Sequence, residues 1–129
     1  LSFNTLTNEY LMKGYLIDPF DQTIKPVTLQ KDNTLGQIYV LCQCERIDGV
    51  YSIDGHTIFV DDEGLFVENQ RYFKYNGQSL AVRALVLGAT EEGDSSDAEE
   101  WVLEHLQQYV EWKPKGFSLQ PRMDFIAWE

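Results

Sequence analysis

The chain has 129 residues, of which 43% are hydrophobic and 24% are charged, and its formal net charge is −11 at pH 7. This length fits one domain over residues 1–129, and the apolar content suffices for a buried core, which excludes a chain that is disordered throughout. The negative charge argues against direct binding to nucleic acid or to an anionic membrane, because both surfaces repel a polyanion.

The cysteines and the N-terminal residues bear on the cellular setting. Cys42 and Cys44 are the only cysteines, and they lie too close in sequence for a low-strain disulfide, so we expect a cytoplasmic protein. No apolar run approaches the ~20 residues that a membrane helix needs. No signal peptide is apparent, and Met12 offers an alternative start that would make residues 1–11 an N-terminal extension.

The first third of the chain predicts a hairpin followed by a helix. Residues 13–18 and 23–29 read as strands around a Pro-Phe-Asp-Gln turn. Pro26 cannot donate to a ladder, so the second strand is expected at a sheet edge or with a break. Asp32-Asn33-Thr34 offers capping residues, and apolar side chains at helical spacing then predict a helix over 34–43.

The middle of the chain predicts four further strands. Asp54-Gly55 is a strong two-residue hairpin signal, because both central positions of such a turn need positive φ. Asn76-Gly77 is a second turn signal, and the residues after it predict a longer loop. The expected strands are 46–53, 56–60, 71–75 and 81–87.

A second helix is expected over 97–111. Ser96 followed by Glu99 matches a capping box, and Pro114 ends the helical pattern. A final strand over 124–128 is also compatible with the sequence. Two helices with mostly hairpin-connected strands predict an α+β fold with an antiparallel-rich sheet of about five to six strands.

The apolar arc of this second helix is unusually wide. It covers roughly 200°, about twice what docking on a sheet requires. The excess edge is either covered by loops or the tail, or it is an interface with a second copy, expected as a dimer, or with a partner. The residues of this edge are Trp101, His105 and Trp112, and the opposite side carries Glu100, Glu104 and Glu111.

No Lys or Arg occurs between Arg83 and Lys113, while eight carboxylates do. Acids near the start of a helix are stabilised by its dipole, typically by ~0.3–1 kcal/mol each, which explains part of this run. The alternative is a negative surface that competes with phosphates for a basic partner protein. In its most specific form, this hypothesis makes the chain a DNA mimic.

A small-molecule or catalytic site is the alternative to protein binding. Asp61, Asp62 and Glu63 follow a strand that begins at His56, and such carboxylates serve acid–base chemistry or bind cations. An ordinary acidic turn explains them equally well.

Cys42 and Cys44 with two histidines lack the paired spacing of a zinc site, so neither a metal nor a cofactor is expected. The common nucleophile, phosphate-binding and zinc-protease motifs do not occur, so nothing in the sequence favours an enzyme.

Three segments carry a resemblance to a known family. They are Met12–Pro19 (MKGYLIDP), Ile58–Leu65 (IFVDDEGL) and Leu85–Asp94 (LVLGATEEGD). Their order over residues 12–95 resembles a family of short uncharacterised bacterial and phage proteins. The resemblance implies a mobile-element or accessory-gene setting, and it implies no catalytic residue. Together these features favour an accessory protein that binds a partner protein through the acidic helix, and a self-assembling structural protein is a third reading.

Overall fold

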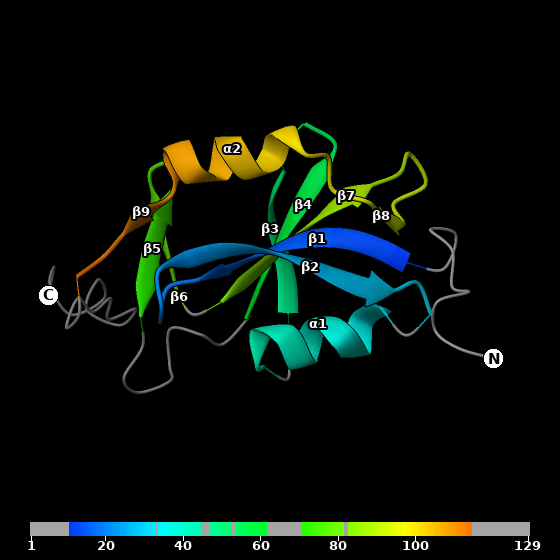
Figure 1. Ribbon diagram of the computed structural model, residues 1–129, viewed down its shortest axis with the longest axis horizontal. Helices are drawn as coiled ribbons and strands as arrows, with labels where there is room; N and C mark the ends of the chain where they lie inside the picture. Colours follow the sequence, from blue (N-terminus) through cyan, green and yellow to red (C-terminus); the bar gives the residue numbers. More distant parts are fainter. Residues whose placement is uncertain are drawn as a thin grey trace, which may run out of the picture.

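The computed structural model describes residues 11–32, 34–44, 47–52, 54–61, 71–81 and 83–114. This part of the chain forms two helices and nine strands (Figure 1). The helices are α1 (Thr34–Cys42) and α2 (Trp101–Tyr109). The strands are β1 (Leu11–Asp18), β2 (Thr23–Gln30), β3 (Ile47–Ser52), β4 (His56–Asp61), β5 (Tyr72–Tyr75), β6 (Gln78–Ala81), β7 (Ala84–Ala89), β8 (Ser95–Ser96) and β9 (Glu111–Trp112).

The main sheet has the strand order β2-β1-β7-β4-β3, and β8 pairs with the end of β7. Every strand pair in the described part of the chain is antiparallel. The predicted α+β class with an antiparallel-rich sheet is therefore confirmed. Pro26 lies in β2 at the edge of the sheet, as expected for a residue that cannot donate to a ladder.

The two helices lie on opposite sides of the main sheet (Figure 1). Central strand β7 is buried along five of its six residues, because both of its faces are covered. Leu85 and Leu87 pack with buried residues of α1, while Ala84 and Val86 belong to the cluster that contains α2. The alternation of side chains along a strand produces this division.

A second, three-stranded sheet with the order β6-β5-β9 extends the α2 side. Phe73 of β5 and Leu80 of β6 are buried in the same cluster as Val102 and Leu106 of α2. This small sheet and the main sheet together provide the apolar surface on which α2 docks. The acidic outer side of α2 is thereby left facing solvent.

The two turn signals of the sequence form tight hairpin turns. Asp54 and Gly55 both have positive φ, at 34° and 82°, between β3 and β4. Asn76 and Gly77 have φ values of 53° and 81°, and they join β5 directly to β6. The longer loop expected after Asn76-Gly77 was wrong, because the two-residue turn itself closes the hairpin.

The single strand expected over 81–87 was also wrong. The segment divides between β6, which pairs with β5, and β7, which lies in the main sheet. Arg83 lies between them, and its Nε is 3.1 Å from a carboxylate oxygen of Asp18. The change of sheet depends on tertiary pairing, so the mostly apolar sequence AVRALVL does not reveal it.

Helix α2 is shorter than the predicted 97–111. Ser96 pairs with Gly88 in β8, and no side chain caps the first turn, so the expected capping box does not form. The helix ends before Val110, whose φ of −81° and ψ of 127° are extended. Pairing of β9 with β5 competes with the last helical turn and removes Glu111 and Trp112 from the helix.

Three predicted features lie wholly or largely outside the described residues. They are the strand expected over 124–128, the proposed extension over 1–11, of which only Leu11 is described, and two carboxylates of the predicted ligand site. Those two carboxylates are Asp62 and Glu63.

Candidate functional site at helix α2

All eight carboxylates between Arg83 and Lys113 are exposed. Within the described ranges, none of them forms an ion pair with a Lys or Arg, because the two ion pairs found there involve Asp18 and Asp21. The negative charge on the α2 side is therefore not neutralised by described cations. The eight residues are Glu91, Glu92, Asp94, Asp97, Glu99, Glu100, Glu104 and Glu111.

Aromatic rings accompany these acids along α2. Trp101 and Tyr109 are 40% and 53% exposed, a large fraction for side chains of this size. His105 lies between them, with its ring centroid 5.9 Å from that of Trp101 and 4.8 Å from that of Tyr109. Spacing of four residues places the three rings on one face, beside the stripe that carries Glu100 and Glu104.

His105 is anchored to the small sheet. Its Nε2 is 2.8 Å from the hydroxyl oxygen of Tyr75. Burial raises the pKa of the Tyr75 phenol, and the nearby Tyr109 adds a smaller contribution in the same direction. Tyr75 therefore stays protonated near neutral pH, and its hydroxyl both donates and accepts hydrogen bonds.

His56 is buried at the entry to α2, with only 2% of its surface exposed. Its Nδ1 lies 3.0 Å from the carbonyl oxygen of Asp54, and its Nε2 accepts the backbone N–H of Glu99 at 3.0 Å. The rings of His56 and Trp101 are nearly perpendicular, and their centroids are 5.5 Å apart. His56 thus connects the β3–β4 turn to the residues that precede α2.

The segment before α2 is also fixed to β1. The Asp97 carboxylate accepts the backbone N–H of Lys13 at 2.8 Å, and the N–H of Ala98 donates to the carbonyl of Lys13 at 2.8 Å. A Cβ atom at Gly88 would collide with the carbonyl oxygen of Asp97, so only glycine permits this crossing. The position of Trp101 therefore follows from several long-range contacts.

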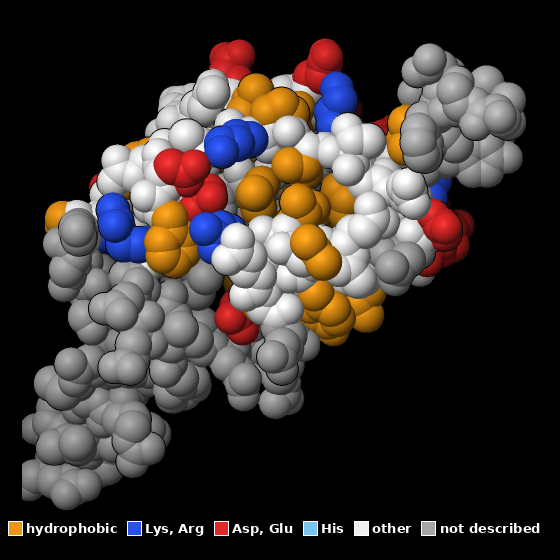
Figure 2. All heavy atoms as spheres, turned by 60° about the horizontal axis from the view of Figure 1, so that its bottom comes forward, with side chains coloured by type: hydrophobic (Ala, Val, Ile, Leu, Met, Phe, Trp, Pro, Cys, Tyr) orange, Lys and Arg blue, Asp and Glu red, His pale blue; other side chains and the backbone are white. Residues whose placement is uncertain are grey.

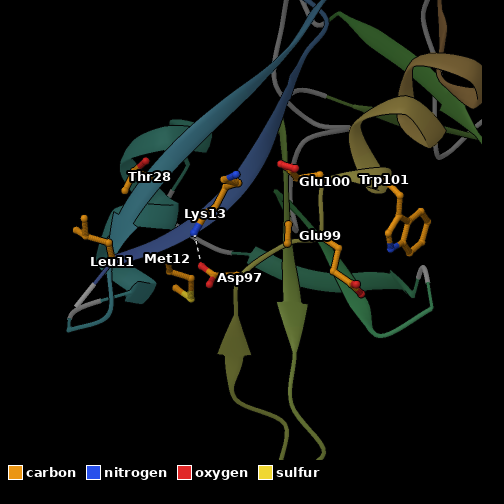
Figure 3. Close-up of a pocket in the computed structure, with 9 residues that line it drawn as sticks. Leu11, Met12, Lys13, Thr28, Asp97, Glu99, Glu100 and Trp101 are labelled. Atoms are coloured by element: carbon orange, nitrogen blue, oxygen red, sulfur yellow. Dashed lines mark hydrogen bonds between the residues drawn. The ribbon is translucent and has the colours of Figure 1, made fainter. Parts of the chain in front are cut away.

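An open groove of about 670 Å³ lies between β1 and this segment. Figure 3 shows Met12 and Lys13 of β1 on one side and Asp97 to Trp101 on the other. Thr28 of β2 and Leu11 complete the described lining. The lining of the groove is mixed, because it combines apolar side chains with three acids, Lys13 and Thr28.

The residues predicted to bind a partner fall into two groups. Trp101, His105, Glu100 and Glu104 lie on or directly before α2, as the sequence indicated. Trp112 and Glu111 instead belong to β9, where Trp112 is partly buried against Phe73 at a centroid distance of 6.5 Å. The continuous edge of Trp101, His105 and Trp112 on one helix was therefore wrong.

The two described residues of the predicted ligand site, His56 and Asp61, do not come together. His56 and Asp61 are the first and last residues of β4, about 16 Å apart at ~3.3 Å per residue. They also lie on opposite faces of the strand, because only alternate residues from His56 onward are buried. His56 is engaged at both ring nitrogens, and no catalytic pair with Asp61 forms.

The opposite side of the molecule has a different character. Figure 2 turns the α1 side forward and shows hydrophobic side chains gathered in the middle of that face. Helix α1 carries no charged residue, and its Leu35 and Val40 are 52% and 75% exposed. Helix α1 thus exposes uncharged apolar side chains, whereas α2 exposes aromatic rings beside carboxylates.

Two further observations concern metals and membranes. No group of three His, Cys, Asp or Glu side chains in the described ranges is placed to hold a metal ion. Burial raises the pKa of the Cys42 thiol to about 12, so this cysteine behaves as a small apolar side chain. Neither described helix has the length and apolar character that crossing a membrane would require.

Comparison with the profiles of protein families identifies the family of this chain. The profile of one family, the Domain of unknown function DUF3846, matches residues 12–111. The chain belongs to this family. The DUF3846 match runs from β1 through α2, so it includes His56, Trp101 and the eight carboxylates, and it extends beyond the 12–95 segment that carries the sequence resemblance. Searches of curated proteins and of solved structures found no significant match.

His56 was predicted beside Asp61, and its contact with the segment before α2 was missed. His56 meets Glu99 across 43 positions, and that contact depends on β4 pairing with β7 and on the close crossing at Gly88. The aromatic row along α2 was detectable, because Trp101, His105 and Tyr109 follow at intervals of four.

Proposed function

We propose that this DUF3846 protein binds a partner protein through the exposed side of α2, and that the partner presents a basic surface. The observation that carries the proposal is the α2 surface itself. Trp101 and Tyr109 are exposed beside Glu100 and Glu104, and no described cation neutralises the acids.

Arginine side chains suit this combination of groups. A guanidinium group stacks on an aromatic face while it donates hydrogen bonds to a carboxylate. Exposed aromatic residues also contribute disproportionately to the binding energy of protein interfaces. Carboxylates around the rings would speed association with a basic partner and make its rate depend on salt concentration.

The test is capture of partners by the wild-type protein and by two charge-reversal variants in parallel. Glu100→Lys/Glu104→Lys reverses two charges at α2. Glu91→Lys/Glu92→Lys makes the same change in net charge in the loop before β8. A helix-centred site predicts loss of a basic partner only with the helix variant. Equal loss with both variants would show that the overall charge, and not α2, attracts the partner.

DNA mimicry is the more specific form of this proposal. Glu100 and Glu104 lie one helical turn apart, about 6 Å along the axis, and the acids continue into the preceding loop. If these carboxylates occupy phosphate positions, a captured partner binds DNA, and duplex DNA displaces the chain competitively. A partner that holds the chain and DNA at the same time would contradict mimicry.

A second candidate function is small-molecule binding in the groove beside β1. Its volume of about 670 Å³ falls within the range of ligand pockets. A thermal-shift screen of metabolites tests it, because binding to the native state raises apparent stability. Trp101→Ala should abolish any stabilisation by a groove ligand, while Glu104→Ala should leave it unchanged.

The mobile-element setting and the homodimer remain proposals as well. Phage, integron or defence genes beside the coding sequence would support the first, and a metabolic operon would oppose it. Sedimentation at high protein concentration tests the second, and a clean monomer would exclude the dimer.

A further inference from the structure

We propose that His56 is a pH-sensitive positioning residue, which holds the entry to α2 only while its imidazole is neutral. The inference follows from the hydrogen bonds of the ring and stands independently of any partner. His56 is 2% exposed, so water does not replace a lost protein partner without local opening.

Two described backbone groups at the ring nitrogens of His56 indicate its protonation state. The carbonyl oxygen of Asp54 only accepts, so Nδ1 carries the proton and donates. The backbone N–H of Glu99 only donates, so Nε2 must offer its lone pair. Only the neutral tautomer protonated at Nδ1 satisfies both contacts at once.

Protonation at Nε2 would place an N–H against the N–H of Glu99. The hydrogen bond would be replaced by repulsion between two donors, in a site closed to solvent. Because Trp101 rests against the same ring, the first turn of α2 and one wall of the groove would loosen together. The hydrogen bond from the Glu99 N–H to His56 Nε2 therefore persists at higher pH and is lost as pH falls.

His105 is an internal contrast on the same helix. Its Nε2 meets the hydroxyl of Tyr75, which donates to a neutral imidazole and accepts from a protonated one. Protonation of His105 therefore keeps its hydrogen bond, whereas protonation of His56 breaks one. The chain has two histidines, and only one of them is placed to act as a switch.

Among the described residues, the charged groups near His56 come from three parts of the chain. Strand β7, which pairs with β4 beside the ring, contributes none. The titratable neighbours in the β3–β4 turn, the segment before α2 and α2 itself are Asp54, Asp97, Glu99, Glu100 and His105. Histidine is the side chain whose charge ordinarily changes between pH 5 and 8, and separate variants of the two histidines distinguish their responses.

Solution NMR of the full chain provides the test. The ring nitrogens of both histidines and the amide exchange of Glu99, Val102 and Leu103 are followed from pH 8 to pH 5, corrected for intrinsic exchange. We expect His56 at pH 8 as the neutral tautomer protonated at Nδ1. As its ring titrates, exchange of the Glu99 amide should accelerate by about tenfold, the effect of losing one hydrogen bond.

Two variants separate a switch from a merely structural contact. His56→Gln presents an oxygen near the Nε2 position that accepts at every pH, so Glu99 exchange should become independent of pH. His105→Gln should retain the wild-type response. The proposal fails if Glu99 stays protected while His56 titrates, if His56 remains neutral down to pH 5, or if His105→Gln removes the response. The wild-type titration alone decides the first two, even if a variant does not fold.

Discussion

Replacement of Leu106 by Ala tests whether α2 is packed on the two sheets as a rigid support for its acidic face. Leu106 is 0% exposed and lies in the cluster that joins α2 to β5, β6 and β7. Truncation removes buried apolar atoms and leaves a cavity between α2 and the two sheets. The surrounding side chains can fill this cavity only partly. Because the site is fully enclosed, we expect a loss of ~3–4 kcal/mol, within the range for buried Leu-to-Ala changes.

Leu103 supplies the matched control, because it undergoes the same chemical change on the same helix at a partly buried position. We expect Leu103→Ala to cost about 1 kcal/mol, since water already reaches part of its side chain. Urea unfolding followed by circular dichroism measures both losses. Equal losses, or a loss below ~1 kcal/mol for Leu106→Ala, would refute the packing of α2 described above.

Three further predictions concern the framework around α2. Asp18→Ala should lower the free energy of unfolding in urea by ~2–3 kcal/mol, because Arg83 loses its partly buried partner; an unchanged midpoint would contradict the ion pair. The raised thiol pKa of Cys42, about 12, gives stability that is present below pH ~8.5 and lost as pH rises toward 12. Cys42→Ala should therefore reduce the alkaline decline in the free energy of unfolding by up to ~1.4 kcal/mol per pH unit, and an unchanged decline would contradict the shift. Gly88→Ala should cost ~1–3 kcal/mol in the same urea assay, because the new Cβ collides with the Asp97 carbonyl; a neutral result would exclude the close crossing.

Local chemistry made much of the fold predictable. Asp54-Gly55 forms the hairpin that its preference for positive φ indicates, and Pro26 lies on an edge strand where no donor is required. Helix α1 begins at Thr34, the last of three capping residues in the sequence. In each case the residues that give the signal lie within a few positions of the turn, strand or helix end that they predict.

The predictions were wrong where a segment distant in sequence pairs with backbone that local signals assign to a helix. Ser96 and Glu99 match a capping box, yet Ser96 pairs with β7 and the N–H of Glu99 is taken by His56. Trp112 continues the helical period, yet pairing with Phe73 draws it into a strand. Neither pairing can be detected in the short stretch of sequence from which helical periodicity is assessed.

The candidate site was predictable to the same extent. The acids and aromatic residues of α2 follow from helical spacing, and their exposure agrees with that pattern. His56 appeared in the sequence only beside Asp61, but β4 holds the two at opposite ends and on opposite faces. Its actual neighbours depend on tertiary crossing, so only the three-dimensional structure reveals its role.

Direct mapping of the binding surface tests the central claim that α2 engages a basic partner. A short arginine-rich peptide is titrated into the ¹⁵N-labelled chain at physiological salt, and amide and indole shifts are followed by NMR. We expect the largest changes at Trp101, Glu104 and Tyr109, and we expect Glu100→Lys/Glu104→Lys to remove them. Changes of equal size at an exposed acid away from α2, such as Asp32, or changes centred on α1, would contradict it.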